Sequence, residues 1–242
     1  MRLISFSLWG TNPKYLAGAL RNAELLATIY PGWRMRFYSA SSVPQPILAR
    51  LQCFPNVDVV RMPEPGDWRA LFWRFYPASE SNVSVMLSRD ADSRISAREG
   101  AAVDAWLQSD KDFHVMRDHP SHDVPILGGM WGVRNRLLGN MRELIDAFPK
   151  SDSWQVDQQF LASIIAPLVR DRWLEHDEYY AKKPFPVAPV DGQFVGQPYD
   201  QFEGPLTMRP SRFEAPLLRI LQAVRRRSSD ARARLLSHGF PR

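Results

Sequence analysis

The sequence predicts an α/β protein in which helices flank a mostly parallel central sheet. Short apolar stretches alternate with helical patterns through the first half of the chain, which is the order typical of parallel sheets. The composition is globular, with 45% hydrophobic and 24% charged residues in 242. The stretch 83–87 is the clearest buried strand, and it runs directly into acidic residues. Ligands of such sheets bind where the strands end at their carboxyl termini.

Strands and helices follow one another along the chain. Strands are expected at 3–8, 35–38, 57–60, 83–87 and 113–116. The first helix is predicted over 15–30, where apolar residues recur at helical spacing, and Pro31-Gly32 ends it. Ser96 and Glu99 have the spacing of a capping box and open another helix. Further helices are expected at 44–51, 68–76, 137–148 and 156–168. The segment 126–133 is too glycine-rich for a simple helix, and 184–199 contains four prolines and is expected to be irregular.

The composition also excludes several classes of protein. No apolar run approaches the roughly 18 residues of a membrane span, and residues 1–10 show no signal-peptide cleavage pattern. Cys53 is the single cysteine, so a disulfide within the chain is impossible, and a core thiol is expected. A reducing, cytoplasmic location is the natural expectation.

The positive charge is concentrated at the C-terminal end. Residues 205–242 contain nine arginines and two acids, a net charge of +7, so the other 204 residues carry −2. We therefore expect a folded domain at 1–204, a basic extension at 205–242, and no nucleic-acid-binding face. The extension has one apolar helical stripe, formed by Phe213, Leu217, Ile220, Leu221 and Val224. Such a helix either lies on an anionic membrane, at the inner face for a cytoplasmic protein, or packs on the domain.

An acidic pair follows the buried strand. Asp90 and Asp92 could bind a divalent cation that bridges a diphosphate, because hard cations prefer carboxylate oxygens. Arg89 and Arg94 flank the pair and could contact phosphate oxygens. A second Asp-x-Asp sequence at 110–112 lies between a predicted helix and strand and is interpreted as a solvated turn. The alternative for the first pair is a surface salt-bridge cluster.

An ordered set of segments can be compared with known families. The segments are strand one with Phe6 and Trp9, Tyr15-x-x-Gly18-x-x-x-Asn22, Tyr30-Pro31-Gly32-Trp33, Trp73-Arg74-Phe75, Ser88-Arg89-Asp90-Ala91-Asp92-Ser93-Arg94, Met116-Arg117-Asp118-His119-Pro120 and Gly128-Gly129-Met130-Trp131-Gly132. This set resembles small glycosyltransferases of the GT-A fold, which is Rossmann-like. The resemblance covers roughly residues 1–200. It implies that Asp90 and Asp92 bind Mn²⁺ or Mg²⁺ with a nucleotide-sugar donor, for which a UDP-sugar is expected. Similarity to glycogenin-like members implies donor contact by Arg74 and a third metal ligand in His176.

The remaining site residues are assigned through the same resemblance. Phe6, Trp9 and Tyr15 are expected to border the base and ribose, and Gly129 and Trp131 to border the sugars. The alternative for the last two is a tight turn beside a core tryptophan. Asp157 and Asp118 are the catalytic candidates. For Asp157, an equally good interpretation is a helix N-terminal acid favoured by the helix dipole, and Asp118 could instead orient its neighbours.

The sequence thus predicts a metal-dependent glycosyltransferase that moves a sugar to a hydroxyl of a carbohydrate or glycolipid acceptor. Synthesis of a surface polysaccharide or glycolipid is the expected setting. One alternative is a nucleotidyltransferase that makes nucleotide sugars, although only Gly10 and Lys14 are available for its usual glycine-rich, basic first loop. The other is a non-catalytic carbohydrate- or membrane-binding module with the same fold.

Overall fold

The computed structural model describes residues 1–149 and 153–208. Its described part is one compact unit that extends to Met208, four residues beyond the expected boundary. The chain after Gly204 still pairs with this unit, because the Leu206 N–H donates to the Pro198 carbonyl at 2.8 Å. The predictions for the basic extension, including its amphipathic stripe and membrane contact, concern residues that lie outside the described part from Arg209 onward.

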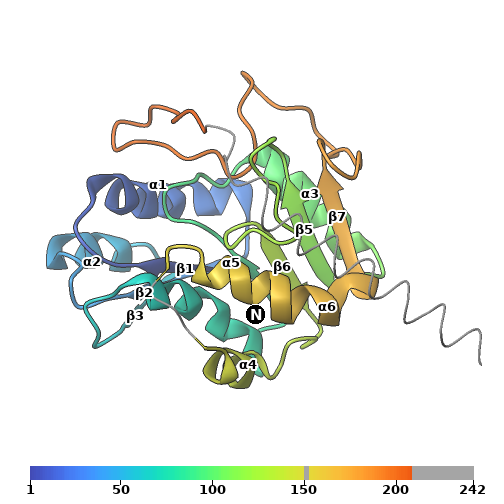
Figure 1. Ribbon diagram of the computed structural model, residues 1–242. Helices are drawn as coiled ribbons and strands as arrows, with labels where there is room; N and C mark the ends of the chain where they lie inside the picture. The colour runs from blue at the N-terminus through green and yellow to red at the C-terminus, as the bar shows by residue number, and fades with distance from the viewer. Residues whose placement is uncertain (150–152, 209–242) are drawn as a thin grey trace, which may run out of the picture. The chain divides into compact units, whose positions relative to one another are not determined.

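The described residues form a seven-stranded sheet with the order β3-β2-β1-β4-β6-β5-β7. The strands are β1 Arg2–Leu8, β2 Arg34–Ser39, β3 Val57–Arg61, β4 Val85–Ser88, β5 Phe113–Arg117, β6 Trp131–Arg134 and β7 Trp173–Asp177. The pairs β1–β2, β2–β3, β1–β4 and β5–β7 are parallel, and β6 alone runs antiparallel to its neighbours β4 and β5. The predicted fold class, a mostly parallel sheet flanked by helices, is confirmed (Figure 1).

Helices cover both faces of the sheet. The helical segments are α1 Pro13–Ile29, α2 Gln45–Gln52, the 3₁₀ helix η1 Trp68–Ser79, α3 Ala97–Gln108, α4 Met141–Ala147, α5 Val156–Phe160, the π-helical turn η2 Leu161–Ile165, α6 Ala166–Val169 and the 3₁₀ turn η3 Arg170–Arg172. Helix α1 begins where the Asn12 side chain accepts the Lys14 N–H. Helix α3 begins at the predicted cap, where Ser96 accepts the Glu99 N–H at 3.2 Å.

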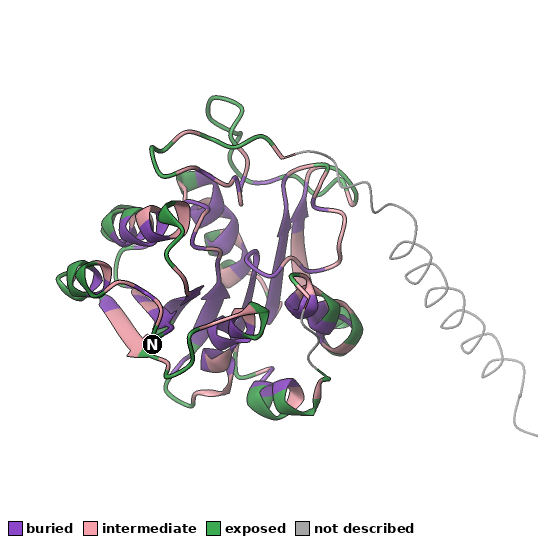
Figure 2. Ribbon diagram, turned by 60° about the vertical axis from the view of Figure 1, so that its left-hand side comes forward, coloured by how far each residue is buried: buried purple, intermediate pink, exposed green. Residues whose placement is uncertain are grey.

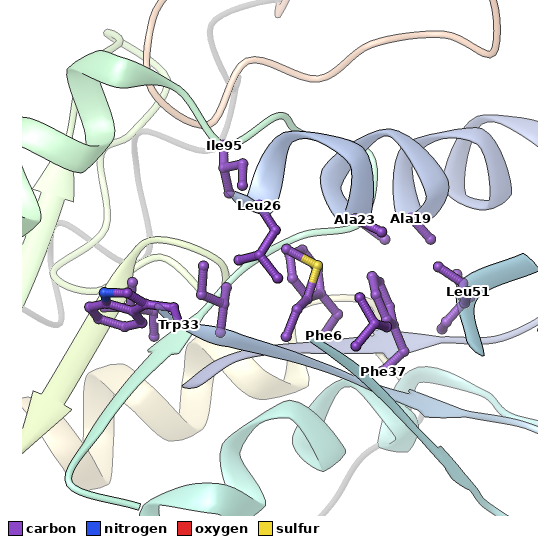
Figure 3. Packing of buried hydrophobic residues seen from close by; sticks show 14 of the residues in the cluster. Phe6, Ala19, Ala23, Leu26, Trp33, Phe37, Leu51 and Ile95 are labelled. Carbon is purple, nitrogen blue, oxygen red and sulfur yellow. The ribbon is translucent and has the colours of Figure 1, made fainter. Parts of the chain in front are cut away.

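The alternation of side chains in β1 divides the core into two layers. Phe6 faces α1 and α2 and stacks on Phe37, with ring centroids 4.8 Å apart (Figure 3). Leu3 points to the opposite face, where η1, α4, α5 and α6 pack. The strands at the centre of Figure 2 are accordingly buried, and the outer sides of the helices are exposed.

Two predicted donor contacts are wrong because their side chains belong to this core. Phe6 is fully buried between β2 and α1 and does not reach a surface cavity. Trp131 is also fully buried, with its ring stacked on Phe113 at 5.3 Å and edge-on to Phe75 at 5.2 Å. The core alternative for Trp131 is therefore the correct one.

The structure differs from the prediction at two further places. The strand β7 was not predicted, because its sequence Trp-Leu-Glu-His-Asp is mostly polar. Its acids are partners of Arg117, which donates to the partly exposed Glu175 at 2.5 Å and to the buried Asp177 at 2.7 Å. Cys53 is exposed at the C-terminal end of α2 instead of being a core thiol.

Acidification is expected to destabilise the domain. Burial lowers the pKa of His122 to about 3 and that of His176 to about 4, and it lowers the pKa of His114 well below its usual value. The folded state therefore binds fewer protons than the unfolded state between about pH 4 and 6.5. Stability falls as the pH drops through this window, by up to about 1.4 kcal/mol per pH unit for each histidine.

Urea unfolding between pH 5 and 7.5 measures this slope. His122→Asn is a suitable comparison, because an amide oxygen can replace the ring Nδ1 that accepts the Asp118 N–H at 3.0 Å. We expect a shallower slope in this variant, and an unchanged slope would show that His122 does not contribute.

Candidate active site

A cavity of about 460 Å³ opens at the carboxyl ends of β1 and β4. Its lining residues come from the loop after β1, the loop after β4, η1, the segment before β6, and α5. They include Ser7, Trp9, Asn12, Tyr15, Trp68, Leu71, Arg74, Asp90, Asp92, His122, Leu127, Gly128, Met130, Trp154, Asp157, Gln158, Gly196 and Pro198. This is the position that parallel α/β sheets offer to ligands.

The loop with the acidic pair is fixed to helix α1. Asn22 donates to the Ser93 carbonyl at 2.8 Å and accepts the Ile95 N–H at 2.9 Å, and it is fully buried. Gly18, one turn earlier, lets the helix approach, since a Cβ there would overlap the Ala91 carbonyl oxygen. The Ser93 hydroxyl and N–H both donate to the Asp90 carbonyl. These contacts hold the acidic loop in one conformation.

Arg74 connects Asp90 with Asp157. Its guanidinium is 4% exposed and donates to Asp90 and, at 2.6 Å, to Asp157. Burial alone would lower the pKa of Arg74, but the two carboxylates outweigh it and raise the pKa above its ordinary value. Burial raises the pKa of Asp157, and Arg74 opposes that rise. The three side chains form one charge network at the base of the cavity.

Asp92 has a different partner. The Lys14 ammonium donates to its Oδ2 at 2.8 Å and lies 4.4 Å from the centroid of the Tyr15 ring. Burial raises the pKa of Asp92, the negative charge of Asp90 adds to this rise, and Lys14 opposes it. Asp90, whose side chain is 46% exposed, is the more accessible acid of the pair.

Two glycines let the backbone before β6 pass the acids. A Cβ at Gly129 would overlap the Asp90 carboxylate and lie 2.8 Å from the Asp90 N atom. A Cβ at Gly128 would overlap both the Asp157 carboxylate and the Arg74 guanidinium. The Ser88 hydroxyl fixes this segment by donating to the Gly128 carbonyl at 2.7 Å. Glycine is required at both positions because any larger residue would collide with these charged side chains.

Aromatic side chains form part of the cavity wall. Trp9 packs edge-on against Trp68, with ring centroids 6.3 Å apart, and Tyr15 lies near the acidic pair. Trp68 and Trp154 remain 42% and 57% exposed although they line the cavity. The cavity therefore combines a charged base with apolar faces on which a planar ring can stack.

Two arginines do not reach the cavity as expected. Arg89 is buried on the other side of its strand end and donates to Glu99 at 2.8 Å and to the Trp131 carbonyl at 3.0 Å. Arg94 donates to Glu203 at 2.7 Å, and its guanidinium lies over the Tyr199 ring. Both guanidinium groups are occupied by protein partners, so the prediction that they hold phosphate is not supported.

Asp118 and His176 also lie away from the acidic pair. Asp118 accepts two bonds from Arg98 and lines a separate cavity with His119 and Glu178, so it is not placed to act with Asp157. The His176 ring bonds to His114 at 2.8 Å, on a strand separated from β4 by β6 and β5. The segments 1–149 and 153–208 contain no group of three His, Cys, Asp or Glu side chains arranged to hold a metal ion. His176 is therefore not the third ligand that the resemblance implied.

Some residues of the site were missed from the sequence. Lys14, which pairs with Asp92 just outside the cavity lining, was considered only for the nucleotidyltransferase loop, although the rule that selected Trp9 could also have selected it as a partner for Asp92. Trp154 and His122 come from loops far away in sequence, and no local pattern points to them.

Comparison with known proteins reveals fold similarity only. No family model and no curated protein matches the chain. A glycosyltransferase involved in glycosylation of the PBCV-1 major capsid matches with a TM-score of 0.50 and 14% identity, over 76% of this chain and 89% of that one. S. aureus TarS (residues 1–349) matches with a TM-score of 0.50 and 14% identity, over 74% and 58%.

The chain has a GT-A-like fold. A cytidylyltransferase from Leptospira borgpetersenii also matches, with a TM-score of 0.46 and 15% identity, over 72% of this chain and 74% of that one. At these identities the comparisons establish the architecture, and the chemistry has to be argued from the cavity of this GT-A-like chain.

Removal of Arg74 is expected to destabilise the domain in a pH-dependent manner. Arg74→Met leaves the buried Asp157 carboxylate without its cation, which costs about 3–5 kcal/mol in such pairs. The pKa of Asp157 then rises further, so the folded state binds more protons than the unfolded state and the deficit shrinks as the pH falls.

Chemical unfolding of Arg74→Met and wild type at pH 5, 6.5 and 8 gives this deficit. The double variant Arg74→Met/Asp157→Asn is the control, because it has no buried carboxylate at this position and its deficit should not vary with pH. A deficit in the single variant that is constant over this range would contradict the assigned pairing.

Proposed function

We propose that this protein is a metal-dependent glycosyltransferase that moves a sugar from a nucleotide-diphosphate sugar to an acceptor hydroxyl. One observation carries the proposal: Asp90, Asp92 and Asp157 converge on one cavity at the carboxyl ends of β1 and β4. The GT-A-like fold supports it, because the two structural neighbours with a TM-score of 0.50 include an enzyme that glycosylates a capsid protein.

The acidic pair fits a hard divalent cation. Carboxylate oxygens suit Mg²⁺ and Mn²⁺, and such ions are commonly held by one or two carboxylates together with phosphate oxygens of the ligand. Asp90 and Asp92 supply two carboxylates, and no third His, Cys, Asp or Glu joins them among the described residues. The remaining coordination positions would therefore belong to the ligand and to water.

The charge of the cavity supports the proposed cation. Arg74 is the one basic side chain among the described lining residues, against three carboxylates, so the lining has a formal charge of −2, which Lys14 offsets in part by pairing with Asp92 from just outside it. This surface repels a diphosphate. A bound divalent cation would reverse the repulsion and neutralise the charge that develops on the departing diphosphate.

The chain's own residues would orient the donor around that charge. Trp9 and Tyr15 provide aromatic faces for the base and ribose, and Arg74 fixes Asp90. Gly128 and Gly129 leave space beside the backbone for the Asp157, Arg74 and Asp90 side chains, so that these charged groups can face the donor. We assign Asp157 to the sugar end of the cavity, where it holds a sugar or acceptor hydroxyl while Arg74 fixes its orientation. A UDP-sugar is the first donor to test, with a carbohydrate or glycolipid as acceptor.

Thermal shift measurements test the donor site. The panel comprises UDP, GDP, CMP and dTDP, each with and without Mn²⁺, on wild type and Asp92→Asn. We expect stabilisation by one nucleotide that depends on Mn²⁺ and is lost in the variant. A ligand at 100 times its Kd stabilises by about 2.7 kcal/mol, which is easily measured.

Asp110→Asn is the matched control, because Asp110 belongs to the other Asp-x-Asp sequence and is exposed at a bend. Asp112 of that sequence is buried and pairs with Arg172, so the predicted solvated turn is wrong for Asp112. It should respond as wild type does. No response to any nucleotide would contradict the donor site. Nucleotide binding that needs no Mn²⁺ and is unchanged in Asp92→Asn would favour a non-catalytic module. Release of pyrophosphate from a nucleoside triphosphate in the presence of a sugar phosphate would favour a nucleotidyltransferase.

We also propose that residues 209–242 attach the enzyme to anionic membrane, with the arginine-rich sequence supplying the charge. Within residues 1–149 and 153–208, no helix combines the length and the hydropathy of a membrane-spanning segment.

Cosedimentation with phosphatidylserine vesicles checks the attachment. We expect wild type to bind at low salt, and a chain truncated after Met208 to lose binding at least tenfold. Equal binding of the two would exclude the extension as the anchor.

A further inference from the structure

The two acids of the pair are neutralised in very different ways. Asp90 is paired with Arg74, which is buried and held a second time by Asp157. Asp92 is paired with the Lys14 ammonium alone, and the Lys14 side chain is 26% exposed and that of Asp92 17% exposed. Arg74 is therefore fixed by its surroundings, whereas the ammonium of Lys14 sits on a flexible stem beside open solvent.

Lys14 occupies a position that is unfavourable for a cation. It lies in the first turn of α1, directly after Pro13, and no acidic residue shares that turn. The positive end of the helix dipole is at this terminus, where a lysine destabilises the helix. Asp92 is the partner that compensates for this placement. A residue that breaks a local rule in this way is a candidate for a function.

The backbone of Lys14 cannot move away from Asp92. Asn22 and Gly18 dock α1 tightly against the loop that contains Asp92. The Asn12 side chain also caps the helix by accepting the Lys14 N–H at 3.2 Å. The ammonium can leave Asp92 by rotation of its side chain, while the neighbouring residues Asn12 and Tyr15 line the same cavity as Asp92.

We propose that Lys14 is an exchangeable counterion of the donor site. Lys14 neutralises Asp92 while no divalent cation is bound, gives up this carboxylate when a cation binds, and then contacts the phosphate oxygens of the nucleotide. This inference rests on the proposed function and adds a residue to it. It assigns Lys14 two opposite effects, because the same ammonium competes with the cation and assists the anion.

The opposite effects of Lys14 on cation binding and on nucleotide binding distinguish an exchangeable counterion from a residue with a purely structural role. Loss of a structural contact would weaken cation and nucleotide binding together. Loss of an exchangeable counterion strengthens the binding of the cation alone and weakens the binding of the nucleotide to the cation-loaded protein. In wild type, cation and nucleotide binding are therefore coupled through Lys14.

Titration calorimetry on the full chain provides the test. Mn²⁺ alone is titrated into wild type, Lys14→Met and Lys14→Gln, and UDP is then titrated into each protein at saturating Mn²⁺. We expect both variants to bind Mn²⁺ about fivefold more tightly, the scale of one partly exposed ion pair. We expect both to bind UDP at least threefold more weakly. Melting temperatures confirm that the variants are folded.

Lys183→Met is the matched control, because Lys183 forms a comparable pair with Glu175 at 2.9 Å on β7, away from the cavity. It should leave both affinities unchanged. Mn²⁺ binding that appears only when Lys14 is replaced would also support the inference. Equal Mn²⁺ affinity in wild type and both variants would overturn it and leave the proposed function standing, whereas no Mn²⁺ binding by any of them would overturn both.

Discussion

The buried guanidinium of Arg74 is the contact on which the cavity depends. It joins η1 to the loop after β4 through Asp90 and to α5 through Asp157, segments that are far apart along the chain. Its own N–H donates to the Ser7 hydroxyl at 3.1 Å, and that hydroxyl donates to the Ala70 carbonyl, so η1 is also tied to β1. A single cation thus sets the relative positions of two acids before any ligand arrives. Such preorganisation is what allows charged groups to stabilise developing charge at little cost.

The one antiparallel strand is equally important for the site. Because β6 runs against β4 and Trp131 lies opposite Ser88, the residues just before β6 pass the carboxyl end of β4. This places Gly128 and Gly129 against the acids, at distances that no side chain at either position would permit. A parallel strand in this place would begin at the opposite edge of the sheet. The antiparallel direction of β6 therefore brings the backbone of the segment before it to the cavity.

The fold class and the position of the acidic pair could be predicted from the sequence. Contacts between segments that are far apart along the chain could not. The apolar strand before Asp90 identified the sheet edge correctly, because the end of a strand can be read locally and ligands of parallel sheets bind at the carboxyl ends of the strands. Period-two alternation shows which residues share a face, but not which face meets a ligand, so Phe6 and Trp131 were misassigned. The partners of Arg89 and Arg94 are Glu99 and Glu203, and the second of these lies 109 residues away, so nothing nearby in sequence showed that Arg94 was occupied.

The exposed Cys53 has a practical consequence. It is the one thiol in the chain, and it lies just before β3, at the amino edge of the sheet, whereas the cavity opens at the carboxyl edge. A nitroxide attached there would be at a unique position and would not obstruct the cavity. Paramagnetic Mn²⁺ bound between the acids would relax that spin label at a rate set by their separation. The native sequence thus provides a molecular ruler from α2 to the proposed metal position without any engineered residue.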